Sequence, residues 1–210
     1  MNHSTVRKSA TGSSLVLDMC GTRLGATRWL MVLGLFLVLI SGNGVASAAS
    51  LLDEQVLAAA NRGDLAQVRR LLDKGADPNA KDAIGNMVLG EAAFSGNLDL
   101  VKFLIDQGSD VKAKRPDGQT VLMCAAIGGN PQVVRLLVEM GLDVNAKTSG
   151  GETALMWASM GGRLEAVKYL LENKAELNAK NASGDTALWY ADMFLMGKDV
   201  AGYLRSIGAK

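Results

Sequence analysis

The chain has 210 residues and a mass of 22.1 kDa, enough for one or two domains with a buried core. Hydrophobic residues make up 49% and charged residues 20% of it, and the net charge is +1. These values exclude a disordered acidic tail or a basic nucleic-acid arm. Two cysteines and one histidine exclude a disulfide scaffold and leave very little for a His/Cys metal site.

Residues 1–48 predict an export signal. A basic N-terminal region precedes an uncharged run at 29–40 (WLMVLGLFLVLI), and small residues in an A-x-A pattern predict cleavage after Ala48. The alternative is an uncleaved membrane anchor, but this run is shorter than the about 20 residues that a spanning helix needs. Translation from Met19 instead of Met1 would leave a signal of ordinary length.

Both interpretations export everything after residue 49. We expect a periplasmic protein if the source is a Gram-negative bacterium, a secreted one otherwise, and a membrane-anchored one if the signal is not cleaved. Removing residues 1–48 leaves 18 Lys and Arg against 20 Asp and Glu, so the net charge becomes −2. The processed chain has no histidine and one cysteine, Cys124.

The rest of the chain repeats every 33 residues. One set of glycines at this spacing is Gly85, Gly118, Gly151 and Gly184. Similar segments follow them, such as GQTVL at 118–122, GETAL at 151–155 and GDTAL at 184–188. Small residues and then apolar residues at helical spacing come next. Each repeat ends in a turn such as GADPNAK at 75–81.

This pattern resembles the ankyrin repeat, whose signature is G-x-T-P-L-H-x-A-A followed by G-x-L-x-x-V-x-x-L-L-x-x-G-A-D-V-N-A. The resemblance covers residues 52–210. It implies an all-α solenoid of about five repeats, each with two antiparallel helices and a β-turn finger. The expected repeats are an N-terminal cap at 52–84, then 85–117, 118–150 and 151–183, and a C-terminal cap at 184–210.

Local signals agree with this assignment. Asp64, Asn97 and Asn130 stand where the second helix of a repeat begins, and we expect them to cap it. Gly75, Gly108 and Gly141 are expected to follow the ends of the second helices.

Departures from the family pattern are also informative. Met87 replaces the usual capping Thr, and Gly90, Met123, Met156 and Trp189 occupy the histidine position of the family.

The processed chain offers little for catalysis. It has no histidine and no metal-ligating or phosphate-binding motif, so we expect neither enzyme activity, nor a catalytic or metal site, nor a cofactor. Cys124 stands in the first helix of its repeat, at a position that normally holds a buried Leu. A shielded core thiol is therefore expected, with a redox thiol as the alternative.

Two rows of residues recur at 33-residue spacing and are candidates for binding a partner. An apolar row at the ends of the first helices consists of Phe94, Ile127, Met160 and Met193. It either faces a partner or packs on the adjacent helices. A lysine row along the fingers consists of Lys81, Lys114, Lys147 and Lys180, with Arg115 beside it. It either steers an acidic partner or is simply solvated.

The resemblance therefore predicts a non-enzymatic, monomeric module that binds an envelope or secreted protein through its concave face of inner helices and fingers. Nucleic acid is not expected, because the processed chain is slightly acidic and the lysine row lacks stacking aromatics. By analogy with small exported bacterial ankyrin proteins, the expected role is protection in stress. The alternatives are an immunity-like inhibitor of a toxin or enzyme, and a secreted effector directed at a host.

Overall fold

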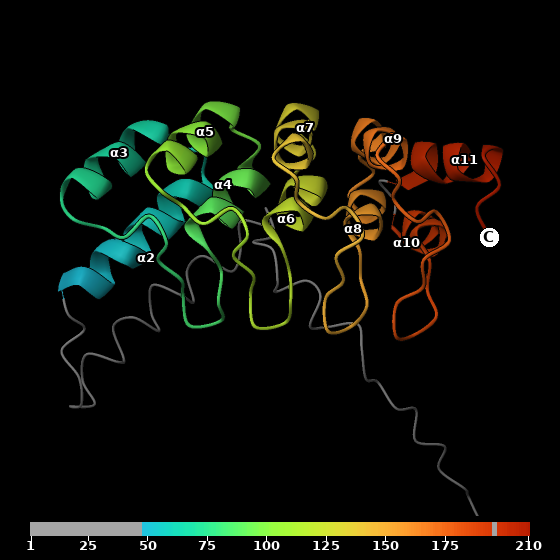
Figure 1. The fold of residues 1–210 in the computed structure, drawn as a ribbon, viewed down its shortest axis with the longest axis horizontal. Coiled ribbons are helices and arrows are strands. Elements are labelled where there is room, and N and C mark those ends of the chain that lie inside the picture. The colour runs from blue at the N-terminus through green and yellow to red at the C-terminus, as the bar shows by residue number, and fades with distance from the viewer. Residues whose placement is uncertain (1–47, 195–196) are drawn as a thin grey trace, which may run out of the picture. The chain divides into compact units, whose positions relative to one another are not determined.

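The computed structural model describes residues 48–194 and 197–210. These residues form five helix pairs stacked side by side (Figure 1). The pairs are α2 (Ala48–Asn61) with α3 (Leu65–Asp73), α4 (Val88–Ser95) with α5 (Leu98–Asp106), α6 (Val121–Gly128) with α7 (Pro131–Glu139), α8 (Ala154–Met160) with α9 (Leu164–Glu172), and α10 (Ala187–Met193) with α11 (Lys198–Ser206). The predicted export segment, apart from Ala48, lies outside the described residues.

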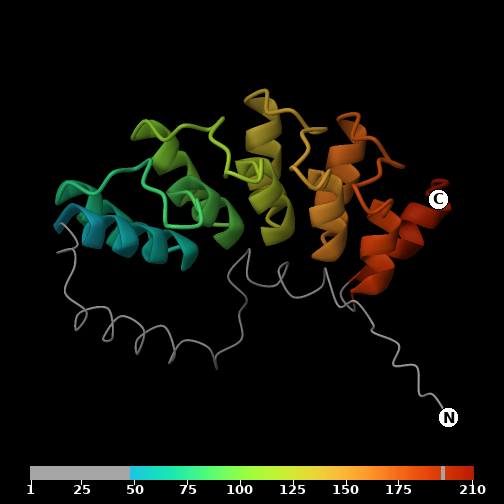
Figure 2. The same cartoon turned by 90° about the horizontal axis from the view of Figure 1, so that it is seen from below.

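The helices form two layers, as Figures 1 and 2 show. The inner layer contains α2, α4, α6, α8 and α10, and the outer layer contains the second helix of each pair. Each inner helix packs against its pair partner and against the inner helices of the neighbouring repeats. The loops between pairs extend as fingers, and the first two complete fingers are closed by single bridges between Lys81 and Met87 and between Lys114 and Thr120. The predicted all-α solenoid with fingers is confirmed.

Side-chain caps start the helices as the sequence predicts. Asp64, Asn97 and Asn130 accept hydrogen bonds from the first-turn backbone N–H groups of α3, α5 and α7. In the inner helices, Thr120, Thr153 and Thr186 do the same for α6, α8 and α10. At α4 the N-cap is Met87, which makes no such bond. Met87 replaces the capping Thr of the three later repeats, so the second repeat lacks this side-chain hydrogen bond, as the sequence indicates.

The core lies between the two layers and between successive repeats. Small residues of the inner helices are fully buried there, namely Ala92, Ala93, Ala125, Ala126 and Ala158. They let the inner helices approach closely. Between neighbouring inner helices the approach is tightest at Gly128, where a Cβ would lie only 2.3 Å from the carbonyl oxygen of Phe94. Backbone therefore touches backbone between the ends of α4 and α6.

Cation–π contacts link the outer helices. The guanidinium of Arg69 in α3 lies 4.1 Å from the ring centroid of Phe103 in α5, and that of Arg135 in α7 lies 4.6 Å from the ring of Tyr169 in α9. The ammonium of Lys168 is 5.8 Å from the ring of Tyr203 in α11. Each basic side chain thus reaches one repeat forward, which adds an inter-repeat contact that the sequence pattern did not predict.

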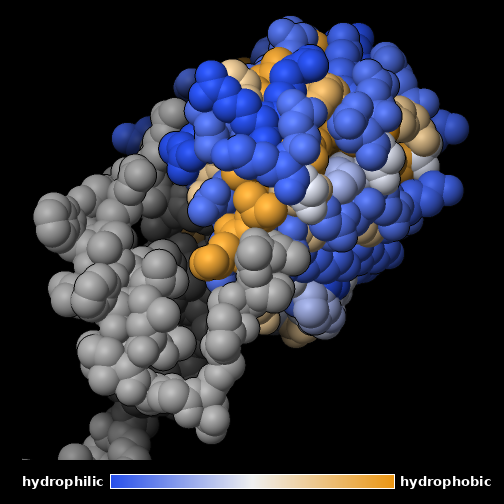
Figure 3. Space-filling model, turned by 90° about the vertical axis from the view of Figure 1, so that its left-hand side faces the viewer, coloured by the Kyte–Doolittle hydropathy of each residue, from blue (hydrophilic) through white to orange (hydrophobic). Residues whose placement is uncertain are grey.

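Both ends of the stack carry polar side chains. At the C-terminal end, Arg205 in α11 makes two hydrogen bonds of 2.6 Å to the carboxylate of Asp192 in α10. The N-terminal end, seen in Figure 3, is largely hydrophilic with a smaller hydrophobic patch. Polar outer faces are typical of the capping repeats of a solenoid. Among the described residues, no helix combines the length and apolar character needed to cross a membrane.

Candidate functional site

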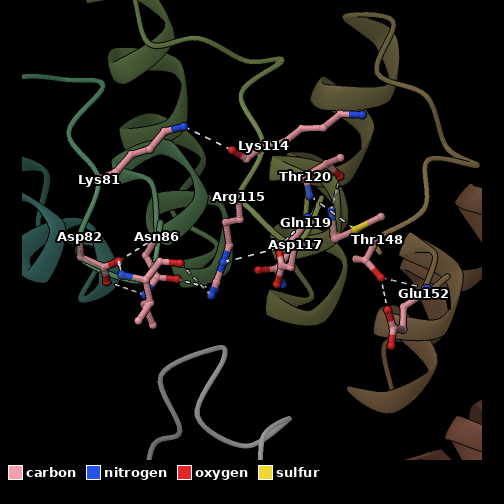
Figure 4. Close-up of polar contacts among 12 residues, drawn as sticks. Lys81, Asp82, Asn86, Lys114, Arg115, Asp117, Gln119, Thr120, Thr148 and Glu152 are labelled. Carbon is pink, nitrogen blue, oxygen red and sulfur yellow. Dashed lines mark hydrogen bonds and ion pairs between the residues drawn. The ribbon is translucent and has the colours of Figure 1, made fainter. Parts of the chain in front are cut away.

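The inner helices and the fingers together form one side of the stack, called here the inner face. At the base of three fingers, the residue that follows the lysine of the row is hydrogen-bonded to the residue that follows the repeat glycine, and Figure 4 shows two of these pairs, Asp82 with Asn86 and Thr148 with Glu152. The pairs are Asp82 with Asn86, Thr148 with Glu152, and Asn181 with Asp185. These bonds hold each finger against the start of its inner helix.

Arg115 occupies the same position in the remaining finger but behaves differently. Its Nη1 donates to the side-chain oxygen of Asn86 at 2.5 Å, as Figure 4 shows. Its Nη2 lies 3.5 Å from the carbonyl oxygen of Ile84, which belongs to the same preceding finger. Its Nε is 3.9 Å from the carboxylate of Asp117. The sequence position of Arg115 predicts a side chain beside the solvent-facing lysine row, but the residue is only 7% exposed. The reason is that its guanidinium joins two fingers, which the spacing alone did not reveal.

The lysine row is exposed along its whole length. Lys81 donates from Nζ to the backbone oxygen of Lys114 at 3.3 Å, which Figure 4 shows, and the Nζ of Lys147 lies 3.9 Å from the carboxylate of Glu176. Solvent screens such exposed pairs strongly. The row therefore keeps most of its charge available at the surface, while Lys81 also bridges two fingers.

Two clefts open between successive fingers, and they are equivalent by the repeat. The first, of about 270 Å³, is lined by Lys81, Asp110 and their neighbours. The second, of about 250 Å³, is lined by Lys114, Asp143 and their neighbours, each 33 positions later. Each cleft is thus lined by a lysine of the row and by a carboxylate, so each contains both a positive and a negative group.

The apolar row lies at the ends of the inner helices. Phe94, Ile127 and Met160 are half-buried, and Met193 is 59% exposed. Since α4, α6, α8 and α10 pack side by side, the structure places the four side chains in order along the stack. The row is therefore part core and part surface, and its use in binding stays a prediction.

A third row, the mid-helix row, comes from the middle of the inner helices and consists of Glu91, Cys124, Trp157 and Tyr190. Cys124 is 6% exposed, which confirms the predicted buried thiol. Burial raises the pKa of Glu91, and the negative charge of Asp82 raises it further, whereas a hydrogen bond from Asn61 and the positive charge of Arg115 act in the opposite direction. The net result is a carboxyl group that resists ionisation.

Tyr190, at the C-terminal end of the mid-helix row, also has a raised pKa. Burial is the largest cause, with smaller contributions from the carboxylates of Glu152 and Asp185, while a hydrogen bond from Asn181 lowers it. The Nδ2 of Asn181 donates to the phenol oxygen at 3.1 Å. Tyr190 thus interacts with the finger base of its own repeat and with Glu152 of the preceding one.

Two further polar side chains of this region were missed by sequence reasoning. Gln119, which follows a repeat glycine, is fully buried, and both polar atoms of its amide lack a hydrogen-bond partner. Trp157 in the mid-helix row is 6% exposed, and its indole nitrogen also lacks a hydrogen-bond partner. Their 33-residue register was the available signal, because they stand at equivalent positions to Glu152 and Tyr190 of the next repeat.

The arrangement of the inner face offers several points of contact to a binding partner. In the described part of the chain, no three or more His, Cys, Asp or Glu side chains gather where they could hold a metal ion. What recurs along the inner face is a set of parallel rows, apolar, polar and basic, at one residue of each kind per repeat. Such rows can contact an elongated partner surface at several points.

The comparison with known families agrees with this architecture. A family model described as ankyrin repeats (3 copies) matches residues 56–148 and 141–210, well over half of the chain. No curated protein matches the chain. Ankyrin repeats are in general protein–protein interaction modules. Stacked helix pairs, fingers and the matched ranges lead to one conclusion: the chain belongs to the ankyrin-repeat family.

Proposed function

We propose that this protein captures an envelope or secreted protein after export, through the concave face formed by its inner helices and fingers. The observation that carries the proposal is the apolar row of Phe94, Ile127, Met160 and Met193, because it keeps partly exposed side chains in register along four repeats. Apolar side chains that stay partly exposed at one position of successive repeats can contact a partner, and Phe and Met are favoured in the cores of interfaces.

The lysine row supports an acidic surface on that partner. Four exposed ammonium groups, one per finger, attract negative charge over a distance of about 8 Å at physiological salt. Their main effect is on the rate of encounter and on the choice of partner. Nucleic acid fits less well, because Asp77, Asp110 and Asp143 repeat in the same fingers and the processed chain is slightly acidic.

The test removes the apolar row without disturbing the fold. Protein carrying Phe94→Ser and Ile127→Ser, and a second variant with Met193→Ser, is used to capture partners from the exported compartment of the producing cell. Because Met193 is 59% exposed, its substitution should leave the thermal midpoint unchanged. We expect the wild-type partner to be lost or weakened at least tenfold in both variants.

The matched control is Met140→Ser, which removes an exposed apolar side chain at the end of the outer helix α7. It should capture the partner as the wild type does. If folded Phe94→Ser/Ile127→Ser protein and the Met193→Ser variant both retain the partner at full affinity, the proposal is wrong.

The consequence of capture for the partner is a separate part of the proposal. We infer a protective role for an envelope protein in stress, with inhibition of a toxin or enzyme, or action on a host, as the alternatives. Sensitivity to peroxide after deletion would favour protection. Rescue of cells from a toxin would favour inhibition, and recovery of the protein outside the producing cell would favour a host-directed role.

A further inference from the structure

Main-chain hydrogen bonds join the tips of neighbouring fingers at equivalent places. The fingers span residues 81–87, 114–120, 147–153 and 180–186, and are called here the first to the fourth finger. The N–H of Ser149 in the third finger donates to the carbonyl oxygen of Asp117 in the second at 2.7 Å. The N–H of Ala182 in the fourth finger donates to the carbonyl oxygen of Gly150 in the third at 2.8 Å. Both donors and both acceptors are 33 positions apart, so the backbone connects the second, third and fourth fingers in the same way.

The first finger lacks this bond. The equivalent donor would be residue 116, but Pro116 has no backbone N–H. The equivalent acceptor, the carbonyl oxygen of Ile84, lies 3.5 Å from Nη2 of Arg115 instead. The ring of Pro116 lies against Gly85 of the first finger, where a Cβ would be 2.4 Å from its Cδ. In the part of the chain that the structure describes, no main-chain hydrogen bond joins the first finger to the second.

Side chains hold the first finger in place of the missing bond. Nη1 of Arg115 donates to the side-chain oxygen of Asn86 at 2.5 Å, and Nζ of Lys81 donates to the carbonyl oxygen of Lys114 at 3.3 Å, as Figure 4 shows. Lys81 is exposed, so water competes for its hydrogen bond, whereas Arg115 is only 7% exposed. The Arg115 side chain is therefore the main link between these two fingers, and is called here the strap.

A side-chain strap restrains a finger less than a main-chain bond does. The Arg115 side chain has several rotatable bonds, so its guanidinium can move with the first finger while its own backbone stays in place. A main-chain bond has no such freedom, because its length fixes the separation of donor and acceptor to within about 0.5 Å. The first finger therefore has a freedom of movement that the other three lack.

We propose that the first finger is a flap, which moves independently of the other three fingers and which the Arg115 strap holds against the second finger. The flap carries Lys81 of the lysine row and Ile84, which is 54% exposed. It can adjust these two side chains to a bound surface while the other fingers keep their positions. This inference does not depend on the proposed function, because it concerns hydrogen bonds within the fold.

The first experiment removes the strap. Arg115→Met keeps an unbranched apolar side chain at the buried position, and Arg115→Lys is a milder second variant. NMR relaxation of the backbone amides, with order parameters and relaxation dispersion, detects motion from picoseconds to milliseconds. In Arg115→Met we expect the order parameter of Gly85 to fall from about 0.85 to below about 0.6, the values of rigid and flexible backbone. Gly184, the equivalent residue of the fourth finger, should stay at about 0.85 because the main-chain bond of its finger is intact.

The second experiment restores the main-chain bond. Pro116→Ser gives the second finger the residue type that the third finger has at this position, with an N–H that can donate to the carbonyl oxygen of Ile84. We expect the amide at position 116 to be protected from hydrogen exchange to the same extent as that of Ser149. In Arg115→Met/Pro116→Ser the order parameter of Gly85 should return to that of Gly184, since a main-chain bond again joins the first two fingers.

The matched controls are Arg135→Met and Pro131→Ser, because both change the outer helix α7 rather than a finger. Neither should alter the relaxation of Gly85. The proposal is wrong if the first finger stays as rigid as the fourth in both Arg115 variants, or if the two fingers lose order to the same extent. Failure of Pro116→Ser to restore the order of the first finger in the double variant would overturn it as well.

Discussion

At the scale of single residues, opposing forces meet at Glu91. Its carboxyl group accepts a hydrogen bond from the amide of Asn61 and experiences the positive charge of Arg115, and both stabilise the ionised form. Burial outweighs them and, with Asp82, raises the pKa. The folded protein therefore holds this proton more tightly than the unfolded chain does. The contribution of Glu91 to the free energy of unfolding falls as pH rises from about 4.3, the ordinary value for Glu, through the raised folded pKa.

Glu91→Gln should therefore stabilise the protein at neutral pH. The glutamine keeps an acceptor for Asn61 but has no charge to desolvate. We expect its thermal midpoint to exceed that of the wild type at pH 7, and the difference to shrink as pH falls below about 4.3, where the carboxyl group of the wild type is neutral in both states. Calorimetry from pH 3.5 to 8 measures this.

The control is Glu139→Gln, which changes an exposed carboxylate of α7. Its midpoint should follow the wild type more closely than that of Glu91→Gln does. A Glu91→Gln variant that is less stable than the wild type at pH 7 would mean that the attraction of Arg115 exceeds the desolvation penalty.

At the scale of elements, four of the outer helices are followed by a residue with positive φ, which is glycine in three cases and lysine in the fourth. Gly75, Gly108 and Gly141 follow the ends of α3, α5 and α7 with φ of 95°, 86° and 83°, which confirms the predicted glycine stops. After α9 the equivalent residue is Lys174, with φ of 66°, the single described residue other than glycine with positive φ. A side chain in this left-handed region costs about 1 kcal/mol. The fourth repeat thus contains a local strain that the others avoid.

Lys174→Gly should raise the free energy of unfolding by about 1 kcal/mol, because glycine adopts positive φ without a clash. The reciprocal change, Gly141→Lys, should lower it by a similar amount. Nothing lies within 4 Å of a Cβ built at Gly141, so only the backbone conformation is affected. Urea denaturation of both variants checks this, and effects of the same sign would contradict the argument.

At the scale of the whole molecule, the last repeat differs from the others on the surface that points away from the stack. Asp192 stands where Ala93, Ala126 and Ser159 are fully buried by the next repeat. Arg205 likewise replaces the apolar Ile105, Val138 and Leu171 of the preceding outer helices. Trp189 is 40% exposed, whereas Met123 and Met156 at the same position are 0% and 1% exposed. The ion pair of Arg205 with Asp192 thus stands where the preceding repeats have small or apolar residues, close to the exposed Trp189.

Restoring the interior residues at this end should therefore cause self-association. The variant Asp192→Ala/Arg205→Leu extends the apolar surface around Trp189, which then resembles the interface between repeats. We expect its sedimentation coefficient to rise with protein concentration while that of the wild type stays constant. The charge-preserving variant Asp192→Glu/Arg205→Lys should behave as the wild type. Association of both variants to the same extent would show that the ion pair is not what keeps this end free.

Much of the fold was predictable, and particular residues show why. The glycine spacing, the caps at Asp64, Asn97 and Asn130, and the burial of Cys124 all depend on patterns that recur within each repeat. Arg115 shows the limit, because its position matches the surface of a finger while its guanidinium lies in the contact between two fingers. Of the candidate site, the positions of the apolar row and the lysine row were predictable, but their degree of exposure was not.

The sequence by itself determined the repeat and the order of helices and fingers, since these follow from local periodicity. The tertiary structure decided which polar groups find partners. The contacts of Arg115 with Asn86, of Arg69 with Phe103 and of Arg135 with Tyr169 all join residues about one repeat apart. Such contacts depend on the particular side chains that the stacking brings together. A consensus pattern averages over those side chains, so they appear only when neighbouring repeats are packed.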